Sequence, residues 1–215
     1  MNDTLNFIKK HKFIAILRNI PEEKLENTAK ALYDGGARIF EITFNPSEED
    51  TVEKTKRAFE IIKNTCPDAL LGAGTVVKKE FVKPAKDAGA RFIVAPNTDG
   101  EIIRLTKAEN MISIPGAFTP TEIVSAYSMG ADIVKIFPIE PHNISYLKNI
   151  LSPISHIPFI TTGGVNADTA CELMKTGAAA LAAGASVIPK DVLERNDFSL
   201  IEKKTHEIID LIQKA

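Results

Sequence analysis

Two charged residues stand inside otherwise apolar stretches of this 215-residue chain, and their types suggest covalent and acid–base chemistry. Glu41 lies in the run RIFEITF (38–44), and Lys135 lies in the run DIVKIFP (132–138). A lysine withdrawn from water has a lowered pKa and therefore a nucleophilic, neutral amine. A carboxylate close to that amine could move protons. The alternative is a structural Lys–Glu ion pair, although buried pairs are poor sources of net stability.

Both apolar runs have the character of β-strands, which assigns each charge to one face. Because side chains alternate across a strand, Glu41 shares a face with Ile39, and Lys135 shares a face with Ile133. A charge placed against a layer of helices costs free energy unless it is paired. We therefore expect both side chains to point into the interior of a closed sheet, near its open end.

Apolar runs and helical patterns alternate along the whole chain. Gly-Ala pairs, as at 89–90 and 130–131, follow the helical patterns, where a left-handed glycine can end a helix. This alternation implies a parallel sheet, and eight units imply an α/β fold of the TIM (β/α)₈-barrel type in a single domain, 1–215, with a short N-terminal helix over 3–10. The predicted strands are 13–18, 38–44, 69–74, 91–96, 111–116, 132–138, 157–164 and 179–186, and the helices are 22–34, 48–64, 78–88, 99–108, 120–129, 143–151, 167–176 and 199–214.

Polar and small residues collect where these predicted strands end. In a barrel the carboxyl ends of the strands form the active-site face. An open, doubly wound sheet is the alternative fold, but it usually has fewer strands and would not explain polar ends spread over every strand. The sequence therefore favours the barrel, with its chemistry at one rim.

Glycine-rich turns follow the seventh and eighth predicted strands. Thr162-Gly163-Gly164 follows one strand, and Gly184-Ala185-Ser186 follows the next. Barrels often bind phosphate at this place, with backbone N–H groups of the two loops and a helix N-terminus. Glycine lets an anion approach the backbone closely. The alternative is that these glycines only form tight turns.

Composition and charge exclude several classes of function. The formal net charge is −2 and the sequence pI is about 6.1, so neither nucleic acid nor an anionic membrane is an expected partner. No apolar run approaches a membrane span, and the polar N-terminus does not resemble a secretory signal. Cys66 and Cys171 lie far apart, as free thiols of a cytoplasmic protein would. The four histidines are scattered, so we expect no metal and no cofactor.

The strand ends, taken together, resemble those of a known family. The segments AILR (15–18), EITF (41–44), GAGTV (72–76), PG (115–116), KIFP (135–138) and TGGV (162–165) occur in that order. This ordered set is similar to the 2-keto-3-deoxy-6-phosphogluconate (KDPG) aldolase and 4-hydroxy-2-oxoglutarate (KHG) aldolase family of class I aldolases. The resemblance extends from about residue 7 to residue 190.

The resemblance implies a role for each matching residue. Lys135 matches the Schiff-base lysine, and Glu41 matches the general acid/base. Arg18 is expected to line the substrate pocket, Thr75 to lie near the pyruvate carboxylate, and Thr162 to lie near the substrate hydroxyls. The implied reaction cleaves KDPG, or 4-hydroxy-2-oxoglutarate, to pyruvate and an aldehyde without a metal. The resemblance also implies that the chain forms a homotrimer and binds a small 2-keto acid phosphosugar as its substrate.

Further residues complete the expected site. Pro96, Phe137 and Asn45 are expected to bind substrate, and the phosphate would be bound by Gly163, Gly164, Gly184, Ala185 and Ser186. Two positions depart from the family pattern. Many members carry an arginine where this chain has Asn45, and a glycine where it has Ala185. The Asn45-Pro46 pair resembles relatives specific for 2-keto-3-deoxy-6-phosphogalactonate, which leaves that epimeric substrate as an alternative.

Two other functions fit parts of the pattern. A phosphosugar isomerase or epimerase barrel would share the phosphate site and would use Glu41 as its base, but such enzymes need histidines at strand ends that this chain lacks. A phosphometabolite-binding barrel without activity would need neither buried charge. Trapping of a lysine adduct would distinguish the aldolase from both.

Overall fold

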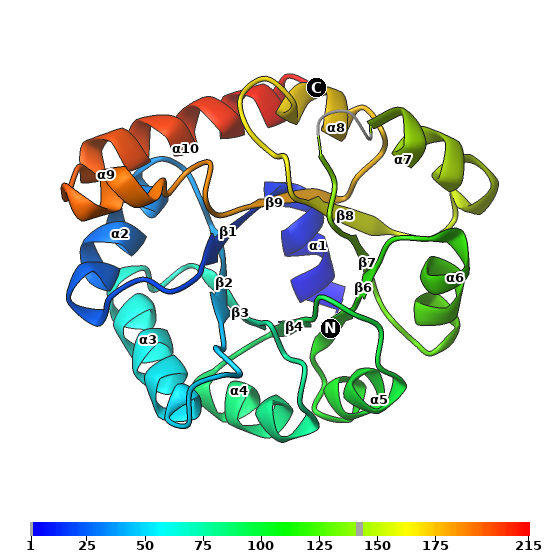
Figure 1. Cartoon of the computed structure of the whole chain (residues 1–215), viewed down its shortest axis with the longest axis horizontal. Coiled ribbons are helices and arrows are strands. Elements are labelled where there is room, and N and C mark those ends of the chain that lie inside the picture. Colours follow the sequence, from blue (N-terminus) through cyan, green and yellow to red (C-terminus); the bar gives the residue numbers. More distant parts are fainter. Residues whose placement is uncertain (1, 141–143) are drawn as a thin grey trace.

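A computed structural model describes residues 2–140 and 144–215 as a closed ring of parallel strands with helices outside it (Figure 1). The strand order within the sheet is β5-β4-β3-β2-β1-β9-β8-β7-β6, and every recorded pairing is parallel. The strands are β1 (Phe13–Leu17), β2 (Ile39–Thr43), β3 (Leu70–Gly74), β4 (Phe92–Val94), β5 (Ile112–Ile114), β6 (Gly116–Ala117), β7 (Val134–Ile136), β8 (Phe159–Thr162) and β9 (Ala180–Ala183). The predicted TIM-like barrel is confirmed.

The fifth predicted strand is split into β5 and β6 on either side of Pro115. Proline has no N–H to donate to a strand ladder, so a break in the strand is expected there. The carbonyl of Pro115 still accepts a hydrogen bond from the Lys135 N–H at 2.8 Å, which joins this strand to β7. Strands β7, β8 and β9 are therefore the sixth, seventh and eighth predicted strands.

Helices surround the strands, and most lie where the sequence predicts them. They are α1 (Asn2–His11), α2 (Glu22–Asp34), α3 (Thr51–Thr65), α4 (Val82–Ala88), α5 (Gly100–Ala108), α6 (Pro120–Ser128), α7 (Ile144–Leu151), α8 (Ala170–Met174), α9 (Lys190–Glu194) and α10 (Phe198–Gln213), with 3₁₀ turns at Lys79–Phe81 and Ser152–Ile154. Residue 143, the first residue of the predicted helix 143–151, lies outside the described residues. None of the described helices is long and apolar enough to cross a membrane.

Local signals account for where several helices begin and end. At α6, the Thr119 side chain and the Glu122 side chain form a capping box, with Pro120 in the first turn. The glycines that follow α2, α4, α6 and α8 in the recurring Gly-Ala signal all have φ between 91° and 108°, as predicted: Gly36, Gly89, Gly130 and Gly177.

The predicted start of the helix over 167–176 was wrong. The Asn166 side chain does not begin a helix at residue 167; its oxygen accepts the N–H groups of Asp168 and Thr169 in a turn. Helix α8 begins only at Ala170 and is five residues long. Helix α9 was not predicted, because the sequence around 190–194 has too few turns to show a helical period.

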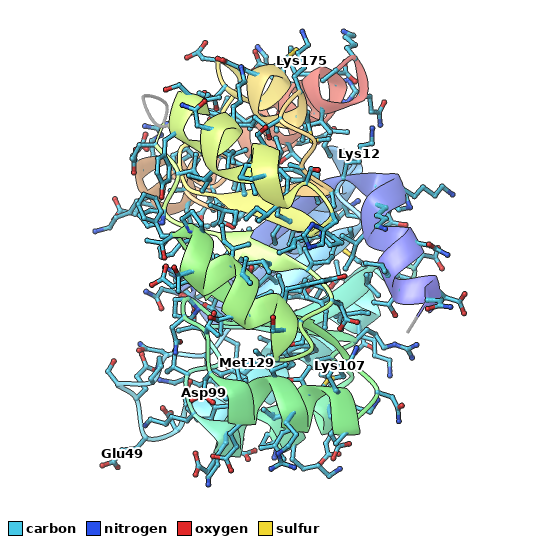
Figure 2. All side chains as sticks on the ribbon, turned by 90° about the vertical axis from the view of Figure 1, so that its right-hand side faces the viewer. Lys12, Glu49, Asp99, Lys107, Met129 and Lys175 are labelled. Atoms are coloured by element: carbon cyan, nitrogen blue, oxygen red, sulfur yellow. The ribbon has the colours of Figure 1, made fainter. Side chains whose placement is uncertain are left out.

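The apolar core has two parts. A large cluster lies between the strands and the outer helices, and a smaller one fills the barrel. The inner cluster contains Ile39 and Ile133, and Ile8 of α1 closes it from below. Helix α1 lies across the opening of the ring in Figure 1. Figure 2 shows Glu49 and Asp99, which follow β2 and β4, at one end of the barrel, with Lys12 and Lys107 toward the other.

Candidate active site

Among the described residues, Lys135 and Glu41 are the charged side chains that are buried. Ile133 and Ile39 belong to the inner cluster, so Lys135 and Glu41, two residues further along the same strands, point inward as well. Glu41 is fully buried, and Lys135 is 3% exposed. The prediction that both charges face into the barrel is therefore confirmed.

The carboxylate of Glu41 has no hydrogen-bond partner. Both of its oxygens are buried and accept no hydrogen bond, from Lys135 or from any other described residue. Gly74 lies directly against this carboxylate, and a side chain at that position would collide with it. A buried polar group without a partner costs about 1–3 kcal/mol. The hydrogen-bonded Lys–Glu pair of the structural alternative is thus not formed.

Burial dominates the electrostatics of Lys135. Removal from water lowers the pKa of its ammonium below the usual range, the Glu41 carboxylate partly offsets this, and the charge of Arg18 lowers the pKa further. The amine lies 5.0 Å from the centre of the Phe137 ring. A lowered pKa increases the fraction of neutral amine near neutral pH, which a lysine nucleophile requires.

A cavity of about 500 Å³ lies at the rim, and neither Lys135 nor Glu41 lines it. Its lining includes Phe137, whose ring lies 5.0 Å from the Lys135 amine, and Ile16, which pairs with Glu41 in the sheet register. Ile16 and Ala182, both of the inner cluster, form its floor. Most of the residues predicted from the sequence line it together: Arg18, Phe137, Thr162, Gly163, Gly164, Gly184, Ala185 and Ser186. Segments far apart in the chain, from β1 to the loop after β9, therefore share one cavity.

The hydroxyl of Thr162 is a free polar group of this cavity. Thr162 lies two residues after Ile160 of the inner cluster, so its side chain also faces inward. Its oxygen is buried and has no hydrogen-bond partner among the described residues. Such a group can bind a hydroxyl of a ligand at little cost, because it gives up no bond to the protein.

The loops after β8 and β9 bring unused backbone donors to the same cavity. Among the described residues, the N–H groups of Gly163, Gly164, Ala185 and Ser186 donate no hydrogen bond to the protein. Gly163 has φ of 96° and packs its α-carbon against the backbone of Ile139, which excludes a side chain there. Since α8 and α9 are only five residues long, these loop amides, and not a helix N-terminus, are the candidate donors to an anion.

Five predicted site residues do not line this cavity: the buried Lys135 and Glu41, and Asn45, Pro96 and Thr75. Asn45 lies in a separate cavity of about 420 Å³ between β2 and α3, where its side chain contacts Glu48 and Ser47. Pro96 is exposed at the end of β4. Thr75 follows β3 with φ of 57°, a conformation that a β-branched residue rarely adopts. Unusual backbone of this kind tends to occur at functional sites.

Two residues that shape the site were not predicted as site residues. Gly74 makes room for the Glu41 carboxylate, and Asn19, with φ of 53°, lines both cavities. Gly74 belongs to the segment GAGT, and Asn19 follows Arg18, so both lie beside predicted site residues. The sequence does not show that the Glu41 side chain occupies the space beside Gly74. No group of three or more His, Cys, Asp or Glu residues lies together in the described part of the chain.

Comparison with known proteins identifies the family. The profile of the KDPG and KHG aldolase family matches residues 5–204. The chain belongs to this aldolase family. The chain is 27% identical over 203 residues to 2-dehydro-3-deoxy-phosphogluconate aldolase of Treponema pallidum, covering 93% of this chain and 94% of the relative. It is 33% identical over 156 residues to a probable 2-dehydro-3-deoxy-6-phosphogalactonate aldolase of Rhizobium meliloti, covering 71% of this chain and 70% of the relative.

A solved structure agrees with the barrel and with the chemistry of the family. KDPG aldolase of Legionella pneumophila, with pyruvate captured as a covalent carbinolamine intermediate, superposes with a TM-score of 0.81 at 25% identity, over 95% of this chain and 97% of that one. The family is thus of the class I, Schiff-base type, and the aldolase is favoured over the isomerase or epimerase alternative.

Proposed function

We propose that this aldolase cleaves 2-keto-3-deoxy-6-phosphogluconate to pyruvate and D-glyceraldehyde 3-phosphate through a Schiff base on Lys135. The observation that carries the proposal is that a buried lysine and a buried, unpartnered Glu41 both face the barrel interior, next to residues that line one cavity. The pyruvate captured in the Legionella pneumophila relative supports a 2-keto acid as the substrate class. The whole chain, 1–215, would serve as one catalytic domain.

Lys135 begins the reaction as a neutral amine. It attacks the C2 carbonyl carbon of the substrate to form a carbinolamine, and loss of water gives an iminium that draws electrons from the neighbouring bonds. The C3–C4 bond then breaks, and its electron pair passes into the iminium to give an enamine. Burial lowers the pKa of the Lys135 ammonium, which increases the fraction of neutral amine available for the attack.

Glu41 moves the protons of this sequence. Its carboxylate takes the proton of the C4 hydroxyl, directly or through a water, as the C3–C4 bond breaks and the aldehyde leaves. The resulting carboxylic acid returns a proton to C3 of the enamine, and hydrolysis of the iminium releases pyruvate and restores Lys135. Because no other group holds the carboxylate oxygens, both are free for this transfer.

The rest of the cavity fixes the two ends of the substrate. The free amides after β8 and β9 bind the phosphate, Thr162 binds a substrate hydroxyl, and Arg18 supplies positive charge at the mouth. Thr75 contacts the carboxylate end, with Phe137 and Pro96 beside the keto acid. Asn45 stays a predicted contact for a substrate that reaches past Asn19 into the neighbouring cavity.

The epimeric 2-keto-3-deoxy-6-phosphogalactonate is a second candidate substrate. The Rhizobium meliloti relative, a probable aldolase for that compound, and the Asn45-Pro46 pair favour it. 4-Hydroxy-2-oxoglutarate is a third, with glyoxylate as the released aldehyde and no use of the phosphate loops. A substrate panel of all three, with pyruvate release as the readout, ranks them by kcat/KM.

Borohydride reduction in the presence of pyruvate tests the chemistry. We expect a stable adduct on the peptide that contains Lys135, found by mass spectrometry, and we expect activity to survive treatment with a chelator because the proposal uses no metal. Reduction without pyruvate is the control. An unmodified Lys135 peptide, or activity lost to the chelator and restored by a divalent metal, would overturn the proposal.

We also propose that the chain assembles as a homotrimer. Three large apolar side chains stay exposed on or just after α6: Val124 (42%), Tyr127 (39%) and Met129 (51%). Exposed apolar groups gathered in one region are typical of interaction surfaces. Sedimentation equilibrium should give three times the chain mass, whereas a Tyr127→Glu variant should shift the protein toward monomer.

The proposed site of action is the cytoplasm. Both cysteines, Cys66 and Cys171, are free thiols. Burial raises the pKa of the Cys66 thiol to about 11, which keeps it protonated and unreactive. Free thiols suit a reducing compartment. Fractionation of cells that express the chain, followed by detection of the protein, would test this placement.

A further inference from the structure

Thr169 ties down the glycine-rich loop that follows β8. Its hydroxyl donates a hydrogen bond to the carbonyl of Gly164 at 2.6 Å and accepts one from the N–H of Asn166 at 3.1 Å. The residue is 6% exposed and does not itself line the cavity. One buried side chain therefore fixes the backbone on both sides of Val165.

The geometry of the peptide bond links this contact to the cavity. The carbonyl of Gly164 and the N–H of Val165 belong to one planar peptide unit and point in opposite directions. A bond that holds the carbonyl toward Thr169 therefore directs the Val165 N–H the other way. Val165 lines the cavity, and its N–H donates to no described residue.

In the turn after Val165, two backbone N–H groups that could otherwise bind an anion are already hydrogen-bonded. The Asn166 side-chain oxygen accepts the N–H groups of Asp168 at 2.9 Å and Thr169 at 3.1 Å. Among the described residues, the free backbone donors of this loop are those of Gly163, Gly164, Val165 and Ala167, and the first three belong to residues that line the cavity. Glycines at positive φ have many alternative conformations, so the loop needs an anchor if its donors are to be fixed before a ligand arrives.

We propose that Thr169 is a positioning residue that orients the Gly164–Val165 peptide toward the phosphate of the substrate. This inference rests on the proposed function, and it adds a specific anchor for the phosphate end. Donors held in place before binding cost less free energy to order when the anion arrives. Thr169 therefore acts on phosphorylated substrates and leaves the chemistry at Lys135 alone.

Two variants separate the hydroxyl from the volume of the side chain. Thr169→Val keeps the shape and removes the hydrogen bonds, whereas Thr169→Ser keeps the hydroxyl. For the phosphorylated epimer that the parent enzyme cleaves, KM should rise about tenfold in Thr169→Val, the scale of one hydrogen bond to a charged group. Its kcat should stay within about threefold, and Thr169→Ser should keep a KM close to that of the parent.

A phosphate-free readout keeps the test specific. The pyruvate concentration that gives half-maximal borohydride trapping should be the same in Thr169→Val and the parent, because pyruvate carries no phosphate. Thr176→Val is the matched control: its hydroxyl donates a bond of 2.6 Å to the Leu173 carbonyl at the other end of α8. It should leave both readouts unchanged.

The outcomes are distinct. Two results would overturn the inference while leaving the aldolase proposal intact. One is that Thr169→Val raises the pyruvate concentration for half-maximal trapping by the same factor as the KM for the phosphorylated substrate. The other is that a folded Thr169→Val variant has an unchanged KM. If Thr169→Val does not fold, Thr169→Ser and Thr169→Ala carry the same comparison. A parent enzyme that traps no pyruvate would instead overturn the proposed function, and this inference with it.

Discussion

The two ends of the barrel interior are built on opposite principles. At the end closed by α1, the fully buried side chains of Ile8, Ile14 and Ile39 belong to the inner apolar cluster. At the open end, Glu41 and Thr162 hold buried oxygens that no described residue satisfies. One end gains stability from apolar burial, and the other keeps polar groups ready for a ligand at a cost in stability. The same strands supply both ends.

The contrast follows from the alternation of side chains along each strand. In β2, Ile39 and Glu41 face the same interior but lie two residues apart, about 7 Å along the strand. In β7, Ile133 just before the strand and Lys135 within it repeat that arrangement. Two residues along each strand therefore separate the apolar layer, which stabilises the fold, from the layer that holds Glu41 and Lys135. Substitutions in the apolar layer should change stability, and substitutions in the other layer should change catalysis.

The largest expected effect comes from removal of the amine at the open end. Lys135→Met should lower kcat by at least about 10⁴-fold, the scale seen when a covalent nucleophile is removed, and abolish borohydride trapping. The melting temperature should not fall, because burial lowers the pKa of the Lys135 ammonium more than Glu41 raises it. Steady-state kinetics and thermal melts measure both. A clear loss of stability would favour the structural ion pair instead.

Neutralising the carboxylate should separate adduct formation from turnover. Glu41→Gln should still trap pyruvate on Lys135, while kcat falls about 10²–10⁴-fold, the usual contribution of general acid–base catalysis. The matched control is Glu60→Gln on the exposed face of α3, which should behave like the parent. A Glu41→Gln enzyme with unchanged kcat would remove the proton-transfer role from Glu41.

At the closed end, truncation should act on stability alone. Ile8 is fully buried, so Ile8→Ala should lower the free energy of unfolding by about 2–5 kcal/mol through lost burial and a cavity. The kcat/KM of the remaining folded enzyme should stay within about twofold, since α1 lies at the opposite end from the cavity. Urea denaturation measures the free energy of unfolding, and initial rates give kcat/KM. Lys10→Ala, exposed on the same helix, is the control.

The smallest expected effect concerns pH. Arg18 lowers the pKa of the Lys135 ammonium, so Arg18→Gln should raise that pKa. Because only the neutral amine attacks, pyruvate trapping rises with pH as the ammonium loses its proton. The rising limb should therefore move to higher pH in Arg18→Gln, by less than about one pH unit. Trapping rates across a pH series measure the shift, and Arg18→Lys, which keeps the charge, should show little of it.

Much of this architecture was readable from local sequence rules. Hydrophobic runs separated by helical patterns predicted the eight units, and glycines before the strands predicted the left-handed helix ends found at Gly36 and Gly89. Strand alternation predicted the inward direction of Glu41 and Lys135. These features depend on neighbours within a few residues, because backbone sterics and side-chain alternation act over that range.

The tertiary structure alone decided which groups surround the predicted site residues. The missing partner of the Glu41 carboxylate, the space that Gly74 leaves for it, and the placement of Asn45 in a separate cavity depend on segments distant in the chain. The late start of α8, with Thr169 bound to the Gly164 carbonyl, arises from a loop whose hydrogen bonds compete with the helix. Such choices depend on packing and hydrogen bonding through space, which the order of residues does not specify locally.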